Sequence, residues 1–240
     1  MIRLSGYVLT LIIWTLVVTC PESKNTLGQD RSSAQKFVIT EKAFNVERTS
    51  SSRTGLWMWW IAVIRNPNPD YYCQSPEVTV TARDARDELV GTYDKNMGAF
   101  LAPGGVIAYG DNLEVTEMPA KIEITPARCY WKKVPMSSVR QLDFRPQKVR
   151  LFQTSLDWNV QGEITNPFDE DIDFLKGAVL FRDKSGKLLG GDLIFIRNLP
   201  AKGTKPFMER LYFKGAMPDK FDQFDFLVFP SSFDWEKIVR

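Results

Sequence analysis

The sequence predicts an all-β protein in which two antiparallel β-sandwiches follow one another in tandem, behind an N-terminal signal or anchor. Three observations support this prediction. Short motifs recur in the same order about one hundred residues further along the chain. Each copy consists of short stretches separated by turn residues at a spacing of about ten residues, which is typical of an antiparallel sandwich. The start of the chain reads as an export signal.

The N-terminal element is the apolar stretch Tyr7–Val18, which follows the basic Arg3. It is shorter than the roughly 20 residues that cross a bilayer, and it has the length of the apolar region of a secretory signal. Val17-Val18-Thr19-Cys20 resembles a bacterial lipobox, with Thr19 where Gly, Ala or Ser is usual. The resemblance implies that Cys20 is lipidated and becomes the mature N-terminus, and two or more acyl chains anchor a protein stably. The alternatives are an uncleaved short anchor and ordinary signal-peptidase cleavage, and all three place the rest of the chain outside the cytoplasm.

The boundaries follow from composition and from the repeat. Pro21–Gln35 has almost no large apolar side chains, so we expect it to be a flexible tether. The expected parts are the signal peptide or membrane anchor (1–20), the tether (21–35), the first β-sandwich (36–130), a linker (131–145) and the second β-sandwich (146–240).

The repeat indicates a duplicated domain, because its period is too long for a solenoid. The drift between matched motifs is only one or two residues. The matched pairs are Leu56 with Leu156, Ile64–Pro67 with Ile164–Pro167, Val80–Asp84 with Val179–Asp183, Leu89–Gly91 with Leu188–Gly190, and Leu101–Gly105 with Leu199–Gly203.

The second copy shows its strands most clearly. Asn166–Asp169, Asp183–Gly186 and Leu199–Gly203 have the composition of turns, since Asn and Asp bond to nearby backbone and Gly adopts positive φ. The predicted strands are Leu156–Thr165, Phe174–Phe181, Lys187–Ile196, Lys205–Phe213 and Phe221–Phe229.

Ala178–Gly190 resembles the core of the FxLYD domain, in which a strand ends in an aromatic residue, a polar residue and Asp before a Gly turn. Gly162–Asn166 is similar to the opening of that domain, and Leu199–Gly203 with Pro206-Phe207 is similar to its ending. The resemblance implies an immunoglobulin-like sandwich of exported bacterial and archaeal proteins, often lipoproteins, without catalytic residues. The first copy is more divergent, because Asp84–Asp87 lacks the turn Gly.

Composition excludes several functional classes. The chain has no His and therefore cannot use a Ser-His-Asp device, a His metal cluster or a His pH switch. Its 31 Lys and Arg against 29 Asp and Glu give a net charge of +2, which argues against a nucleic-acid partner. We expect a protein that is not an enzyme and that holds no cofactor and no metal.

Cysteine usage agrees with export. If Cys20 is lipidated, Cys73 and Cys129 remain as an even number in an oxidising compartment. They either form a disulfide or are two separate buried thiols.

The segment Trp57–Ile64 is apolar on both faces of a strand. One interpretation is a central strand whose second face packs on the other domain or on residues 36–48. The other is an exposed aromatic surface for a partner, a glycan or a bilayer. The candidate residues of such an interaction surface are Trp57, Trp59, Trp60 and Trp131.

Two charged stretches have two interpretations each. Asp169–Asp173 is a solvated acidic loop or a calcium site, although it lacks the spacing of a known calcium loop. Arg128–Lys133, with Tyr130 and Trp131 among its basic residues, is a connector with solvated lysines or a contact for anionic lipid.

These features together predict a non-catalytic structural or protein-interaction module of the cell envelope. It would be exported and membrane-anchored, with a protein partner in the envelope. One alternative is an accessory subunit of a membrane protein complex, held by an uncleaved anchor and docking through its Trp-rich face. A second alternative is a carbohydrate-binding or hydrolytic envelope protein.

Overall fold

The computed structural model describes residues 34–50, 53–134, 144–155, 157–211, 220–232 and 234, and Ser33–Arg240 form one compact unit. The described residues hold thirteen β-strands and no helix, so the all-β prediction is confirmed. The expected signal or anchor, including Cys20, and almost all of the expected tether lie outside the described residues. In the part that is described, no helix is long and apolar enough to cross a membrane.

The strands of the second copy lie close to their predicted positions. The first seven strands are β1 Val38–Arg48, β2 Leu56–Arg65, β3 Tyr71–Arg83, β4 Leu89–Asn96, β5 Phe100–Leu101, β6 Val106–Glu114 and β7 Lys121–Lys133. The other six are β8 Arg145–Gln153, β9 Trp158–Thr165, β10 Ile172–Arg182, β11 Leu188–Leu199, β12 Thr204–Arg210 and β13 Gln223–Pro230. Residues 131–133, which the sequence assigns to the linker, belong to β7, and β8 already begins at Arg145.

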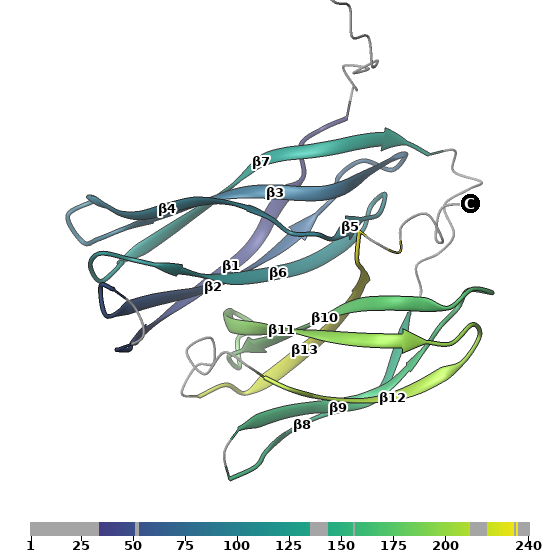
Figure 1. The fold of residues 1–240 in the computed structure, drawn as a ribbon. Coiled ribbons are helices and arrows are strands. Elements are labelled where there is room, and N and C mark those ends of the chain that lie inside the picture. Colours follow the sequence, from purple (N-terminus) through teal and green to yellow (C-terminus); the bar gives the residue numbers. More distant parts are fainter. Residues whose placement is uncertain are drawn as a thin grey trace, which may run out of the picture. The chain divides into compact units, whose positions relative to one another are not determined.

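All strand pairings are antiparallel and form four sheets (Figure 1). Sheet 1 has the order β1-β2-β6, and in sheet 2 the central β3 pairs with β4, β5 and β7. Sheet 3 has the order β8-β9-β12, and sheet 4 the order β11-β10-β13. The pairings within residues 145–230 therefore repeat those within residues 38–133, with β8 to β13 in the places of β1, β2, β3, β4, β6 and β7.

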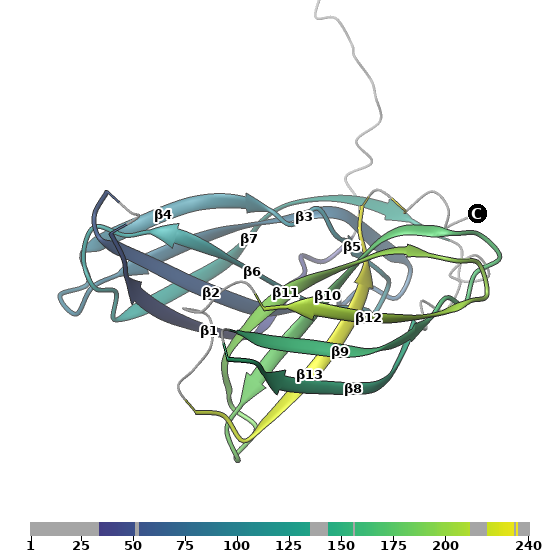
Figure 2. The ribbon, with the colours of Figure 1, turned by 60° about the horizontal axis from the view of Figure 1, so that its bottom comes forward.

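The sheets are stacked as layers in the order 2, 1, 4, 3 (Figures 1 and 2). One hydrophobic cluster joins sheets 2 and 1, with Val80 and Met58 among its members, and it also includes Leu180 from the outer face of sheet 4. A second cluster joins sheets 4 and 3, with Val179 and Val160 among its members. β10 therefore buries alternate side chains in two different cores.

The unusual strand β2 is apolar on both faces because both faces are covered. Met58 and Trp60 point between sheets 1 and 2. Ile61 lies on the opposite face and is still buried, since β11 lies against it and a Cβ added at Gly191 would be 2.5 Å from Ile61 Cδ1. For this part of β2, the structure favours packing against the other copy over an exposed aromatic surface.

The repeated Asn-Pro motif ties a turn to a distant loop in the same way in both copies. The side chain of Asn66 donates to the carbonyl oxygens of Tyr71 and Ala102, and its backbone N–H donates to Gly105. The corresponding bonds of Asn166 go to Glu170, Pro200 and Gly203. Both side chains are buried, so each amide satisfies backbone groups that would otherwise lack partners.

The hairpin turn of the FxLYD-like motif also recurs, despite the missing glycine. Asp183 accepts hydrogen bonds from the backbone N–H groups of Ser185 and Lys187, and Asp84 accepts the equivalent bonds in the first copy. Gly186 has a φ of 85°, and Asp87 takes the same place with a φ of 69°. Asp tolerates this left-handed conformation better than most residues do, which explains how the turn forms without Gly.

Candidate functional site

The four tryptophans singled out in the sequence do not form one surface. Trp60 is only 3% exposed, its Nε1 donates to Tyr93 Oη at 2.8 Å, and its ring packs against Tyr109. An interaction role for Trp60 on an exposed surface is therefore wrong, because its side chain points into the core between sheets 1 and 2.

Trp57 and Trp59 lie together on the outer face of sheet 1, with ring centroids 6.5 Å apart and partial exposure. Trp59 Nε1 donates to Glu47 on β1 at 3.3 Å. Trp59 also lies beside Gly191 and Leu193 of β11. These two tryptophans therefore mark the border of the area that sheet 4 covers.

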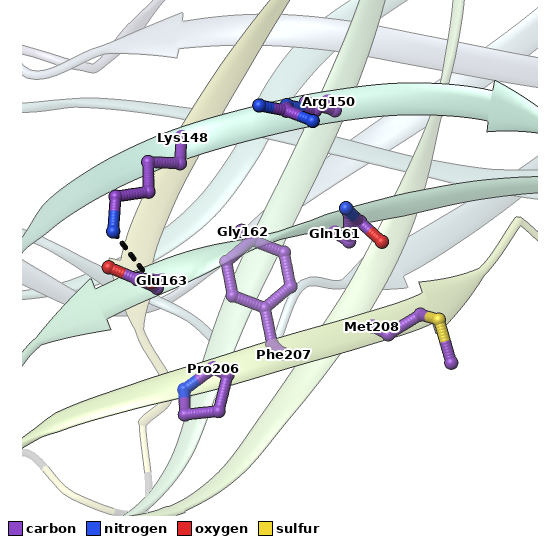
Figure 3. A pocket seen from close by; sticks show the side chains of 8 residues that line it. All are labelled: Lys148, Arg150, Gln161, Gly162, Glu163, Pro206, Phe207 and Met208. Atoms are coloured by element: carbon purple, nitrogen blue, oxygen red, sulfur yellow. Dashed lines mark hydrogen bonds and ion pairs between the residues drawn. The ribbon is translucent and has the colours of Figure 1, made fainter.

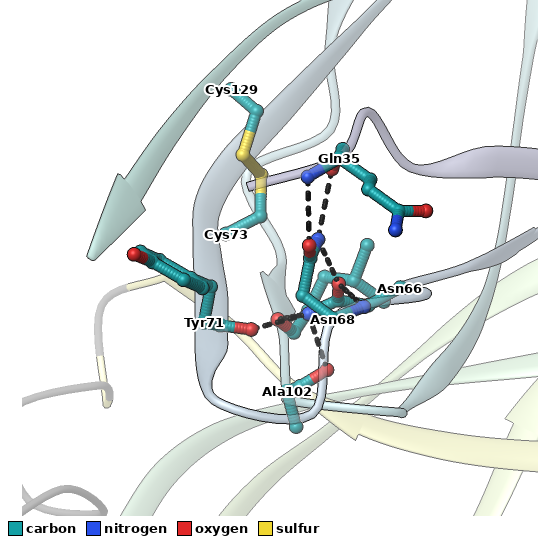
Figure 4. Close-up of a disulfide and its surroundings, with 8 residues drawn as sticks. Gln35, Asn66, Asn68, Tyr71, Cys73, Ala102 and Cys129 are labelled. Atoms are coloured by element: carbon teal, nitrogen blue, oxygen red, sulfur yellow. Dashed lines mark hydrogen bonds between the residues drawn. A yellow bond between two sulfur atoms is a disulfide. The ribbon is translucent and has the colours of Figure 1, made fainter. Parts of the chain in front are cut away.

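Trp131 belongs to sheet 2 and lies near the cysteines (Figure 4). Cys73 on β3 and Cys129 on β7 form a disulfide with Cα atoms 5.7 Å apart. Trp131 follows Cys129 by two positions and, like it, packs against the core. Its side chain is therefore on a different sheet from the Trp57–Trp59 pair.

The contact between the two copies is polar at its margin. Arg182 of β10 donates through both terminal nitrogens to the carboxylate of Glu41 on β1, and through Nε to Asp225. The hydrogen bond to Glu41 is the largest cause of the raised pKa of Arg182. Asn45 Nδ2 donates to Leu189 O at 3.2 Å, which adds a second bond between β1 and β11. These residues fix the docking of the copies and are not available to a ligand.

A hollow of about 570 Å³ lies on the outer face of sheet 3 (Figure 3). Its floor is the pair Gly162–Phe207, because the ring of Phe207 packs in the core. The rim consists of the neighbouring outward positions, which are Lys148, Arg150, Gln161, Glu163, Pro206 and Met208.

The rim combines positive charge with apolar surface. Lys148 has a φ of 53° where the register between β8 and β9 shifts, and its Nζ lies 3.0 Å from Glu163. Arg150 has no carboxylate partner among the described residues. Met208 is 67% exposed. Methionine and arginine are enriched in protein–protein interfaces, so this rim has the chemistry of a protein-contact site.

The sequence analysis did not single out this hollow. The one available signal was Met208, an apolar residue at an outward position beside the inward Phe207. The shift that turns Lys148 outward involves neither Gly nor Pro, so no pattern announced it.

The acidic loop is bound by its neighbours in the structure. Lys202 Nζ lies 3.3 Å from Asp169, and Asp171 accepts the N–H of Ala201 at 2.8 Å. Across the described residues, no group of three or more His, Cys, Asp or Glu side chains is placed to hold a metal.

No family model matches the chain, and a search of curated proteins matches none. Among solved structures, it is similar to Bacteroides uniformis beta-glucuronidase 2 covalently bound to cyclophellitol-6-carboxylate aziridine, with 11% sequence identity and a TM-score of 0.22. The match covers 74% of this chain and 28% of the glucuronidase chain, so this chain spans less than a third of that protein.

Proposed function

We propose that the chain is an exported, lipid-anchored and non-catalytic protein of the cell envelope. Its two immunoglobulin-like β-sandwiches, of the FxLYD type and arranged in tandem, present one outer face to a protein partner. The equal strand pairings of the two copies support the duplication, as do the equivalent bonds of Asn66 with Asn166 and of Asp84 with Asp183.

The hollow on sheet 3 is the observation that carries the partner-binding part of this proposal. It lies on an outermost layer of the stack, where side chains of sheet 3 meet no further sheet (Figure 2). Exposed Met208 supplies apolar area, and Arg150 supplies a charge that is free to pair with a carboxylate. A partner segment with an acidic side chain beside an apolar one fits this chemistry.

The two exposed methionines of the described chain allow a matched test. Met208 lies on the hollow, and Met118, which is 47% exposed, lies in the turn before β7. We expect a photo-crosslinking residue at Met208, introduced into the full chain in its native cells, to give one defined protein adduct. The same residue at Met118 should give none. Equal adducts at both positions would contradict partner binding at the hollow.

Anchoring is tested by the mass of the mature N-terminus from native membranes. A diacylglycerol-modified Cys20 at the N-terminus is the expected result. An intact Met1 would favour the alternative of an accessory subunit held by an uncleaved segment. Reduction should also add two hydrogen masses if Cys73 and Cys129 are bonded in the exported protein, as they are in the structure.

A further inference from the structure

The chain joins the described body at a fixed point beside β7. The backbone N–H of Gln35 donates to Asn68 Oδ1 at 2.7 Å, and Asn68 Nδ2 donates to Gln35 O at 2.8 Å (Figure 4). Asn68 is itself held by Asn66 at 2.9 Å. Everything that precedes Gln35 therefore departs from this corner of sheets 1 and 2.

Basic side chains gather at the same corner. A shallow groove of about 250 Å³ runs between Lys36-Phe37 and residues 126–131 of β7, and both Lys36 and Arg128 line it. Phe37 is buried and fixes this end of the chain against the core. Lys36 is exposed and has no acidic partner among the described residues.

The outward positions of β7 extend the basic character. Arg128, Tyr130 and Lys132 are exposed, whereas the intervening Cys129 and Trp131 pack against the core. Tyr130 is 54% exposed, and a hydrogen bond to it raises the pKa of Arg128. We call Lys36, Arg128, Tyr130 and Lys132 the basic patch.

Negative groups only partly offset the basic patch. Glu77 is paired with Arg128 across the strands, and Asp70 lies 3.8 Å from Lys133 next to the patch. Lys132, like Lys36, has no acidic partner in the described part of the chain. A surplus of positive charge beside an exposed tyrosine is the combination that binds anionic headgroups at a membrane surface.

We propose that the basic patch lies against anionic lipid headgroups when the protein is anchored. This inference rests on the proposed lipid anchor at Cys20. The thirteen residues 21–33 reach at most about 45 Å when fully extended, and they end next to the patch rather than at the far layer, sheet 3. The anchor therefore holds the patch close to the bilayer, where charges act within a Debye length of about 8 Å.

The test uses the full chain, inserted through its own N-terminus into two kinds of vesicle. One contains phosphatidylcholine alone, and the other contains phosphatidylcholine mixed with phosphatidylglycerol. We expect amide hydrogen exchange of residues 126–133 to be several-fold slower on the anionic vesicles, and the difference to disappear at high salt. The double variant Lys36→Glu/Lys132→Glu should lose the slowing. Lys184→Glu/Lys187→Glu, at an exposed turn of the second copy, should keep it.

Three results would overturn the inference: equal exchange on both vesicles, slowing that is insensitive to salt, and slowing only in native membranes that contain other proteins. The last result would assign the patch to a protein partner instead. The fate of Cys20 is read separately, by mass. Exchange that depends on anionic lipid without acylation would sink the anchor and leave the patch standing, and acylation without such exchange would do the reverse.

Discussion

At the scale of single residues, Lys176 on β10 carries a charge into the contact between the two copies. It is 8% exposed, its Nζ donates to Met97 O at 2.6 Å, and it lies 5.2 Å above the ring of Tyr109. Burial lowers the pKa of Lys176 to about 8, and repulsion from Lys95, which itself pairs with Asp111, acts in the same direction.

This lowered pKa predicts that the folded protein becomes more stable as pH rises above about 8. Between that pH and 10.5, the folded state has released the proton while the unfolded lysine retains it. At about 1.4 kcal/mol per pH unit, the free energy of unfolding should rise by about 2 kcal/mol between about pH 8 and 9.5. Urea unfolding at a series of pH values measures this rise.

The variant Lys176→Met is the control for that prediction, because it keeps the apolar stem and removes the titrating group. Its stability should change little over the same pH range. The range ends below pH 10 because buried tyrosines, such as Tyr109, have raised pKa values, so that their ionisation in the unfolded state then opposes folding. Equal slopes for the wild type and the variant would contradict the assignment to Lys176.

The buried amide of Asn166 leads to a second prediction. Asn166→Ala removes the donor to Glu170 O and Pro200 O and the acceptor for Phe168 N–H. Three backbone groups lose their partner, so we expect the free energy of unfolding to fall by about 3 kcal/mol in denaturant titrations. Asn159→Ala, which removes only one bond of 3.2 Å to Asp157 O, should cost clearly less. Similar losses for both variants would show that the bridging role of Asn166 is unimportant.

At the scale of elements, the two copies differ in which outer faces are apolar. On the outer face of sheet 2, Thr79 bonds to Asp94, and Thr81 bonds to Thr92. The corresponding positions of sheet 4 are Ala178 and Leu180, which are buried against sheet 1. The same strand pairing therefore has a solvated outer face in the first copy and a docking face in the second.

The closest approach in this docking contact predicts the effect of a single methyl group. In Gly191→Ala, the new Cβ would lie 2.5 Å from Ile61 Cδ1 and 2.6 Å from Val179 O. Because a backbone atom cannot move aside easily, we expect a loss of about 1–3 kcal/mol in unfolding free energy. The additional change Ile61→Val removes Cδ1 and should recover part of that loss. Additive effects of the two substitutions would mean that β11 and β2 do not meet as described.

Prolines mark several edges of the sheets. Pro126, Pro146 and Pro206 lie on β7, β8 and β12, which each pair with a single neighbouring strand in the described residues. Proline has no N–H to offer, so these edges are poor templates for adding another strand. Partner binding at sheet 3 is therefore expected to use its face and not its edge.

The sequence was informative about elements where the pattern depends on the strand itself. Alternation and turn residues placed the strands of the second copy, and the Asn-Pro and Asp-Gly motifs marked turns that the structure contains. The cover of Ile61 could not be predicted, because two apolar faces do not reveal which element lies against them. The hollow beside Lys148 also escaped prediction, since it depends on a register shift between β8 and β9.

At the scale of the whole molecule, one hydrophobic cluster extends through three of the four sheets. It combines Trp60 and Val80 of the first copy with Leu193 and Phe229 of the second. Separating the copies would expose this surface to water, at about 25 cal/mol for each Å² of apolar area. The copies should therefore behave as one cooperative unit and not as independent beads.

This continuity predicts a single unfolding transition for the full chain. In scanning calorimetry, the calorimetric and van't Hoff enthalpies should agree, and Asn166→Ala in the second copy should shift the entire transition. Two separate transitions, of which only one moves in the variant, would show that the copies unfold independently.

The unequal outer faces also have a consequence for how such a chain can be rearranged by recombination. The first copy provides the receiving surface on sheet 1, and the second copy provides the inserting surface on sheet 4. A gene with the halves exchanged would join two polar faces and leave both apolar ones in water. Once these surfaces had diverged, the order of the halves became heritable as a pair, and neither half remained free to be shuffled alone.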